Sequence, residues 1–184
     1  RNPFAQFRIT PSVKEREYLT EGEIRQLIEH EFSDATLAFT RDLFVFACFT
    51  ALSFADIREL TTDEIMDVNG EKWIISKRHK TGVPFQVKLL DIPLQIIGKY
   101  RPFQKDNSVF GKINYWNVCK KLKKVISECG INKQISFHCS RHTFGTLALS
   151  KGMPIESVSR VLGHTNIKTT QIYAKITTQK LGND

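Results

Sequence analysis

Apolar side chains recur at helical spacing along the first third of the chain. Thr20 followed three residues later by Glu23 is a capping box, which predicts that a helix begins here. Residues 34–51 are apolar on nearly every side, and this pattern predicts a helix buried at the centre of the protein. A short helix is expected to follow at residues 54–60.

The pattern then changes to one typical of strands. Three short strands are predicted at residues 64–68, 72–77 and 84–89. Asn69-Gly70 supplies the first tight turn, and Thr81-Gly82 supplies the second. These segments therefore predict one small antiparallel sheet.

Helical periodicity returns after the strands. Pro93 suits the first position of a helix, and another helix at about residues 115–129 is ended by Gly130. Three more short helices are expected near residues 139–151, 155–162 and 167–176. The predicted fold class is therefore α+β, mostly helical with a small three-stranded antiparallel sheet.

The length of the chain and its composition along the sequence predict one substantial domain with short flanking segments. Residues 1–18 are basic, lack helical periodicity and are interrupted by prolines, so we expect an interdomain linker there. The domain itself is expected to span residues 19–176. Residues 177–184 then form a C-terminal tail.

The composition favours a polyanionic partner. Lys and Arg number 27 against 19 Asp and Glu, which gives a formal net charge of +8. Such a surplus is typical of proteins that bind nucleic acid or an anionic membrane surface, although an ordinary basic protein also fits it. Even the apolar run LFVFACFTAL is too short to span a membrane, and the first residues lack the apolar segment of a signal peptide.

The four cysteines are scattered along the chain without C-x-x-C spacing. A zinc site or a disulfide framework is therefore not expected, and reduced intracellular thiols are the default interpretation. Cys48 falls in the most apolar helix and is predicted to lie in the core. A packing role is also favoured for Cys139, ahead of a reactive thiol.

The most informative residues lie near the carboxyl end. The segment HCSRHTFGTLA contains His138 and Arg141, and VLGHTNIKTTQIYA contains His164, with Tyr173 nine residues further on. A phenol, a guanidinium and two imidazoles are the groups needed to cut a phosphodiester without a metal ion. The alternative is that Tyr173 simply packs on an amphipathic helix with neighbouring isoleucines.

The order and spacing of these residues resembles the tyrosine recombinase (phage integrase) family, in which His-x-x-Arg precedes a Gly-His pair and then the nucleophilic Tyr. The resemblance covers most of the chain from about Leu19 onward. It implies the tyrosine recombinase catalytic-domain fold for residues 19–176. It also implies an enzyme that cleaves and rejoins DNA strands through a covalent 3′-phosphotyrosine, with no metal, ATP or other cofactor.

The resemblance implies a role for each motif residue. Tyr173 is the nucleophile, and Arg141 binds the scissile phosphate with its two-pronged guanidinium. His138 accepts the phenol proton, and His164, near the predicted N-cap Thr165-Asn166 of the Tyr-bearing helix, donates to a non-bridging phosphate oxygen. His142 directly follows Arg141 and is expected to point elsewhere, in a packing or supporting role.

One departure from the family concerns its first arginine. Members usually show Gly-Leu-Arg-x-x-Glu where this chain reads ALSFAD, so Asp56 fits the acidic position but Ser53 replaces the cation. Arg58 lies five residues beyond Ser53 and faces another side of a helix. Strand periodicity places Arg78 on the same face as Lys80. Our hypothesis is that Arg78 supplies the missing guanidinium, and the alternative is a strand arginine that touches the DNA backbone elsewhere.

Lysines complete the set of candidates. The Lys-Thr-Gly spelling at Lys80 resembles the hairpin lysine that protonates the departing 5′-oxygen in the family, although an exposed turn lysine is usually just solvated. Lys120, Lys121 and Lys124 fall near one helix face, and Lys168 lies close to the tyrosine. These four are predicted to contact DNA phosphates, and a solvated face is the alternative.

The resemblance implies a site-specific recombinase that integrates or excises a mobile element. Its partners would be double-stranded DNA sites and accessory DNA-bending proteins, with a monomer in solution and a homotetramer on DNA. The expected location is the bacterial cytoplasm, at the nucleoid when bound to DNA. The family's N-terminal core-binding domain is expected to be absent from this chain. A type IB topoisomerase-like enzyme and a DNA-binding module without catalysis remain alternatives.

Overall fold

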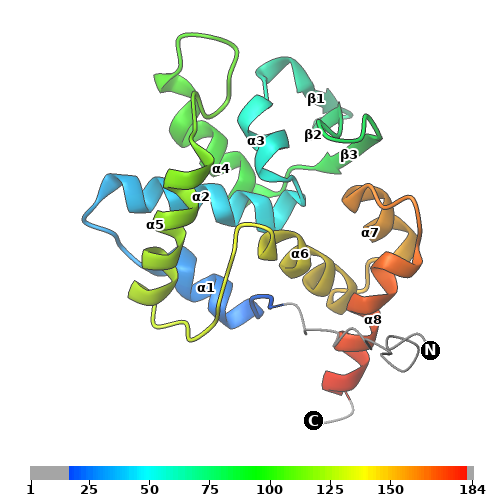
Figure 1. Ribbon diagram of the computed structural model, residues 1–184. Coiled ribbons are helices and arrows are strands. Elements are labelled where there is room, and N and C mark those ends of the chain that lie inside the picture. The colour runs from blue at the N-terminus through cyan, green and yellow to red at the C-terminus, as the bar shows by residue number, and fades with distance from the viewer. Residues whose placement is uncertain (1–16, 182–184) are drawn as a thin grey trace, which may run out of the picture.

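The computed structural model describes residues 17–181 as a mostly helical domain with one antiparallel sheet (Figure 1). The elements are, in chain order, α1 (Glu21–Glu29), α2 (Ala35–Thr50), α3 (Phe54–Glu59), η1 (Thr62–Glu64), β1 (Ile65–Val68), β2 (Glu71–Lys77), β3 (Pro84–Lys88), α4 (Asp91–Tyr100), η2 (Arg101–Phe103), α5 (Tyr115–Glu128), α6 (Cys139–Ser150), α7 (Ile155–Leu162) and α8 (Lys168–Leu181). The predicted fold class is confirmed. Most of the predicted linker and the last three residues of the predicted tail lie outside the described residues.

Helix α2 is the centre of the main core, as its apolar sequence predicts. Asp34 caps it, with Oδ1 accepting a hydrogen bond from the backbone N–H of Thr36 at 2.8 Å. Helices α1, α4, α5 and α6 all pack against α2 (Figure 1). Phe44 and Phe46 are fully buried, and Phe44 meets Phe137 edge to face. Burial on every side explains why this helix shows no polar face.

The sheet has the order β1-β2-β3, and both pairings are antiparallel. Asn69 and Gly70 join β1 to β2 with φ values of 55° and 82°, the left-handed geometry of a two-residue hairpin turn. Ile74 pairs with Val87, and one face of the sheet buries both together with Phe85. Strand β3 also contacts α7, so the sheet connects the main core to the C-terminal helices.

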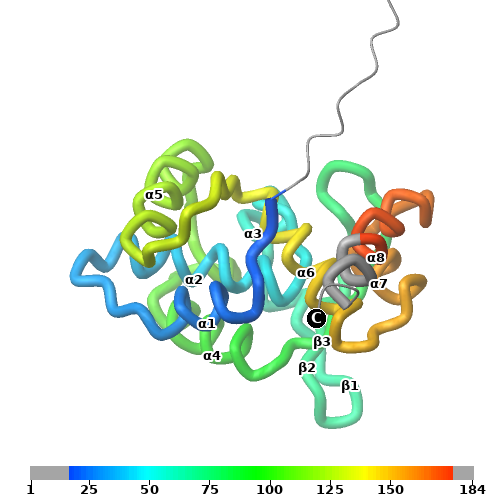
Figure 2. The backbone as a smooth tube through the Cα atoms, turned by 90° about the horizontal axis from the view of Figure 1, so that it is seen from below, coloured from blue at the N-terminus to red at the C-terminus, as the bar shows by residue number. Residues whose placement is uncertain are grey.

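A second, smaller apolar cluster lies among α6, α7 and α8. Its buried members are Ala51, Phe144, Val158, Leu162 and Tyr173. Figure 2 shows these three helices beside one another, with α7 and α8 on the side of α6 away from α1, α4 and α5. The candidate nucleophile is therefore held by a small satellite core rather than by the main one.

Two predicted helix boundaries differ from the structure. Helix α4 begins at Asp91, so Pro93 occupies its third position rather than its first. Proline is tolerated there because the first N–H groups of a helix have no intrahelical acceptor. Helix α8 begins at Lys168 and continues to Leu181, well beyond the predicted end at residue 176.

Two cysteines have the packing role expected of them. Cys48 and Cys139 are both buried, and burial raises the pKa of the Cys48 thiol well above its ordinary value. Throughout residues 17–181, no helix combines the length and apolar character required to cross a bilayer.

Candidate active site

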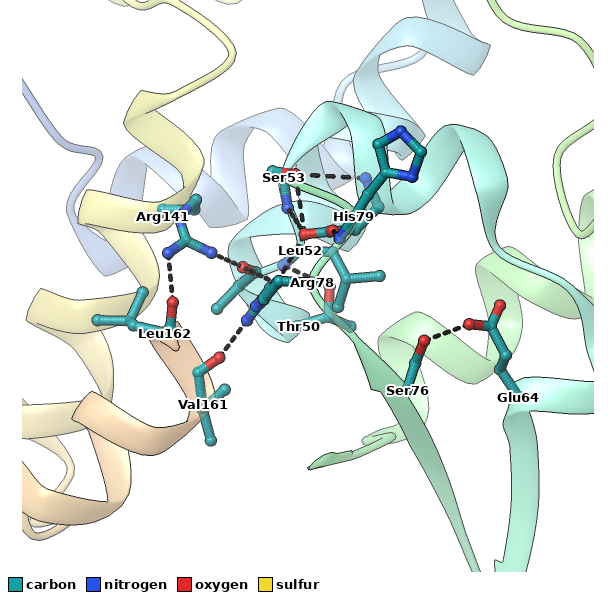
Figure 3. Close-up of polar contacts among 12 residues, drawn as sticks. Thr50, Leu52, Ser53, Glu64, Ser76, Arg78, His79, Arg141, Val161 and Leu162 are labelled. Carbon is teal, nitrogen blue, oxygen red and sulfur yellow. Dashed lines mark hydrogen bonds and ion pairs between the residues drawn. The ribbon is translucent and has the colours of Figure 1, made fainter. Parts of the chain in front are cut away.

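Arg141 is held by the carboxyl ends of two helices. It is the third residue of α6, and its Nη1 donates to the carbonyl oxygen of Ala51 at 2.5 Å. Its Nη2 donates to the carbonyl oxygen of Leu162 at 2.5 Å (Figure 3). These carbonyls end α2 and α7, where the last carbonyl groups lack intrahelical donors and carry partial negative charge. The guanidinium is therefore fixed in place while some of its N–H groups remain available.

Arg78 lies directly beside Arg141. It follows the last residue of β2 and is only 6% exposed. Its Nη1 donates to Oδ2 of Asp56 at 2.8 Å and to the same Ala51 carbonyl at 3.2 Å, while Nη2 donates to the carbonyl of Val161. The guanidinium also lies over the ring of Phe85, 4.0 Å from its centroid. Two arginines that are distant in sequence thus meet at one backbone carbonyl (Figure 3).

The two guanidinium groups repel each other, and Asp56 opposes that repulsion. Burial, followed by the charge of Arg78, lowers the pKa of Arg141 to about 10, while Asp56 and Tyr173 act in the opposite direction. Burial also lowers the pKa of Arg78, against its hydrogen bond to Asp56. Both arginines nevertheless stay charged at neutral pH, because the ordinary pKa of a guanidinium lies far above neutrality. The site is therefore cationic before any ligand arrives.

Asp56 is the counterion of this pair and the anchor of the surrounding loops. Its Oδ1 accepts the N–H of His79 at 2.9 Å, and its Oδ2 accepts the N–H and hydroxyl of Ser53 at 3.0 Å and 2.8 Å. Burial raises the pKa of Asp56, but these hydrogen bonds and Arg78 outweigh it, so the net pKa is lowered. Ser53, which stands where a cation was expected, is the N-cap of α3.

Tyr173 is buried against α6, and its hydroxyl group is hydrogen-bonded to a histidine. The residue is 3% exposed, and its Oη lies 2.7 Å from Nδ1 of His142. Gly145 makes room for the ring, since an added Cβ there would be 2.7 Å from Cδ2 of Tyr173. His142 has the packing or supporting position expected of it, but it contacts the candidate nucleophile instead of pointing elsewhere. The i, i+4 spacing of His138 and His142 was the available signal, because such residues share one helix face.

The other two histidines flank this centre. His138 is the exposed N-cap residue of α6, and its ring meets that of His142 edge-on with centroids 4.7 Å apart. His164 follows the left-handed Gly163 that ends α7, and its Nδ1 lies 2.8 Å from Oγ1 of Thr170. His138 thus lies beside His142, and His164 contacts α8 at Thr170, three residues before Tyr173.

The hairpin does not place Arg78 and Lys80 together as strand periodicity predicted. Strand β2 ends at Lys77, and the following residues form a turn in which Lys80 is exposed while Arg78 is buried. Strand alternation does not extend into a turn. Arg58 is also outside the arginine pair, because it is exposed and forms a 2.8 Å ion pair with Glu59.

The candidate DNA-binding lysines do not form one cluster. Lys120 and Lys124 are exposed on α5, Lys121 is half-buried on the same helix, and Lys168 is exposed at the start of α8. Helices α5 and α8 lie apart in both views (Figures 1 and 2). Lys124 also has an exposed i, i+4 partner in Glu128, with nitrogen and oxygen 3.7 Å apart.

A groove of about 660 Å³ beside α5 contains basic and aromatic side chains. Trp116, 78% exposed, and Lys123 come from α5, whereas Lys133 comes from the loop before α6. Lys133 is engaged with Glu23 at 2.6 Å. Within the described part of the chain, no group of three or more His, Cys, Asp or Glu side chains is placed to hold a metal ion.

Comparison with known proteins gives consistent matches. The family profile described as "Phage integrase family" matches residues 17–180. Tyrosine recombinase XerA of Pyrococcus horikoshii is 33% identical over 136 residues, which are 68% of this chain and 47% of that protein. Tyrosine recombinase XerA of Saccharolobus solfataricus is 32% identical over 127 residues, covering 68% of this chain and 43% of that protein. The chain thus spans about half the length of these relatives.

Solved structures share the fold. A post-cleavage complex of the XerH site-specific recombinase with palindromic difH substrate matches with a TM-score of 0.75 and 21% identity, covering 92% of this chain and 52% of that one. The XerA recombinase matches with a TM-score of 0.70 and 23% identity, and the match covers 89% of this chain and 65% of that one. At such identities the likeness reports the fold alone, which is the one predicted from the sequence.

Replacing Gly145 with alanine is expected to push the Tyr173 ring off α6. The added Cβ overlaps the ring, so the unfolding free energy should fall by about 1–3 kcal/mol. Gly98→Ala is the matched control, because its added Cβ meets no atom within 4 Å and alanine favours a helix. Urea unfolding of both variants measures the difference. Equal stability of Gly145→Ala and the wild-type protein would contradict the observed packing.

Asp56→Asn is expected to change how stability depends on pH. A carboxyl whose pKa is lowered by folding stabilises the protein above its unfolded pKa, and this contribution is lost as pH falls below about 4. The variant should be about 2–3 kcal/mol less stable at pH 7, with the gap narrowing in acid. Unfolding curves between pH 3 and 7 test this, with the exposed Glu59→Gln as control. A gap that stays constant down to pH 3 would be the contrary result.

Proposed function

The chain belongs to the phage integrase family, and from this membership we propose that it is a site-specific DNA recombinase acting through a covalent 3′-phosphotyrosine at Tyr173. The observation that carries the proposal is the preformed cationic pair of Arg78 and Arg141 beside the buried phenol. A phosphodiester is the ligand that suits two adjacent guanidinium groups. The structural neighbours named for DNA complexes support double-stranded DNA as that ligand.

In the proposed reaction, Oη of Tyr173 attacks the scissile phosphorus as the bond to the 5′-oxygen breaks. Arg141 donates to the non-bridging oxygens, whose negative charge grows in the transition state. Because the phenol is 3% exposed without DNA, the side chains that cover it have to move before a backbone phosphate reaches its oxygen. The apolar cluster that contains Tyr173 is small and separate from the main core, which suits such a local movement.

Three further residues would handle protons and charge. His138, exposed at the start of α6, accepts the phenol proton, since an imidazole titrates near neutral pH. His164 donates to a phosphate oxygen. Lys80, on the exposed hairpin turn, protonates the departing 5′-oxygen once the hairpin meets DNA.

Arg78 would supply the guanidinium that other family members carry at the position of Ser53. Two contacts support this role. Arg78 and Arg141 both donate to the carbonyl of Ala51, and Arg78 also donates to Asp56, the acidic residue of the segment that contains Ser53. Among the described residues, the buried Nε of Arg78 has no hydrogen-bond partner.

The energetics of the step favour a reaction without ATP. One phosphodiester is exchanged for another, so the energy of the broken bond is retained in the phosphotyrosine and is available for rejoining. Two guanidinium groups and a lysine supply the positive charge that a phosphoryl transfer requires, and the proposal therefore needs no metal ion.

The proposed partners are those that membership of the family implies. Paired double-stranded DNA sites would be joined in a homotetramer, with a monomer in solution and accessory DNA-bending proteins assisting. Lys120, Lys121, Lys124 and Lys168 would contact the phosphate backbone. The match to the Tn1549 transposon integrase, 16% identical with a TM-score of 0.73, supports a mobile element as the context. The proposed location is the bacterial cytoplasm.

Tyr173→Phe is expected to abolish covalent DNA attachment while leaving DNA binding intact. The chain is incubated with a half-site suicide substrate whose cleaved end is lost, which traps the intermediate. Mass spectrometry of the digested wild-type product should find nucleotide on the peptide that contains Tyr173. Attachment in the phenylalanine variant, or to another residue, would refute Tyr173 as the nucleophile.

Arg78→Ala is expected to slow cleavage of the same substrate about 100- to 1,000-fold, because one phosphate-binding donor group is lost. Arg58→Ala is the control and should stay within about twofold, since Arg58 is exposed and pairs with Glu59. Adding Ser53→Arg to the Arg78→Ala variant should restore part of the rate if both positions reach one phosphate. Near-normal cleavage by folded Arg78→Ala would remove Arg78 from the site.

A further inference from the structure

His142 forms a direct contact with the candidate nucleophile that the proposed mechanism leaves unused. Its side chain is 4% exposed, and its Nδ1 lies 2.7 Å from Oη of Tyr173. The two rings are tilted by 44° with centroids 5.7 Å apart. An oxygen and a ring nitrogen at this distance share a proton in a hydrogen bond.

The surrounding packing leaves the Tyr173 ring little freedom. Gly145 lies against one side of the ring, and the buried side chains of Phe144, Val158 and Leu162 belong to the same apolar cluster. With the ring held, the remaining freedom of the phenol is rotation of its O–H bond. The hydrogen bond to His142 removes that freedom as well.

This hydrogen bond matters for attack. If the O–H group donates to Nδ1, the hydrogen bond fixes where Oη lies relative to α6 before the reaction. A nucleophile must lie in line with the bond that breaks, and small errors in this geometry are costly. As Oη attacks, its proton leaves to His138, which meets His142 edge-on with centroids 4.7 Å apart and lies next along the same helix face.

We propose that His142 is a positioning residue for the nucleophile: its Nδ1 accepts the hydrogen bond of the Tyr173 hydroxyl and sets the orientation in which Oη is presented beside the arginine pair. This inference rests on the proposed function, in which Tyr173 attacks DNA. It gives a role to a buried histidine that directly follows Arg141. Histidine is required there only as a hydrogen-bond acceptor.

Two substitutions separate this role from packing. His142→Leu keeps an apolar side chain but removes the acceptor. His142→Asn keeps an acceptor, because Oδ1 of asparagine is as many bonds from Cα as Nδ1 of histidine. Single-turnover cleavage of the half-site substrate is measured at saturating protein, with DNA affinity and thermal unfolding recorded in parallel. His30→Leu, at the end of α1, is the control histidine.

The expected result is a cleavage rate about 10- to 100-fold lower for His142→Leu, with unchanged DNA affinity, and a rate within about threefold of wild type for His142→Asn. A normal rate for His142→Leu overturns the proposal. So does an asparagine variant as slow as the leucine variant, because positioning alone would then be insufficient.

A second measurement needs neither DNA nor activity. Nitrogen-15 spectra of the histidine side chains should show a neutral His142 ring protonated at Nε2, and its Nδ1 signal should shift in Tyr173→Phe. An Nδ1 signal that does not respond to loss of the hydroxyl overturns the proposal even if the leucine variant unfolds. If the wild-type protein forms no covalent adduct while Nδ1 does respond, the proposed function fails and the hydrogen bond stands.

Discussion

The structure depends on one backbone carbonyl that two arginines share. Ala51 ends α2 in a left-handed conformation, with φ of 57°, and its oxygen accepts from both Arg78 and Arg141. Bringing two guanidinium groups this close is unfavourable by itself. Asp56 and the carboxyl end of α7 supply the negative charge that makes it stable. The end of α2, the end of β2, the end of α7 and the start of α6 meet at this point as a result.

The arginines and the nucleophile are held at one small apolar cluster by different contacts. The arginines are fixed to backbone carbonyls at the ends of α2 and α7. Tyr173 lies on α8, where one hydrogen bond to His142 and the close fit at Gly145 define its place. Ala51, Leu162 and Tyr173 all belong to this cluster, so the phosphate-binding groups and the nucleophile are kept close together before DNA binds.

Local sequence rules predicted the elements well, because capping, turn and periodicity signals act over a few residues. The capping box at Thr20 and the Asn69-Gly70 turn are examples. The contacts within the site were harder to predict from such rules. That Arg78 meets Asp56 depends on how the hairpin packs onto α3, and strand periodicity wrongly placed Arg78 beside Lys80. The contact of His142 with Tyr173 likewise requires the docking of α8 on α6, which no local pattern encodes.

The most direct test of the account is a crystal structure of the chain with a half-site duplex and orthovanadate in place of the scissile phosphate. The account predicts vanadium bonded to Oη of Tyr173, with its oxygens contacting both Arg141 and Arg78 while Arg141 remains on the Ala51 carbonyl. Vanadate bound away from Tyr173, or bound with the two arginines turned from it, would contradict the claim that this pair forms the phosphate site.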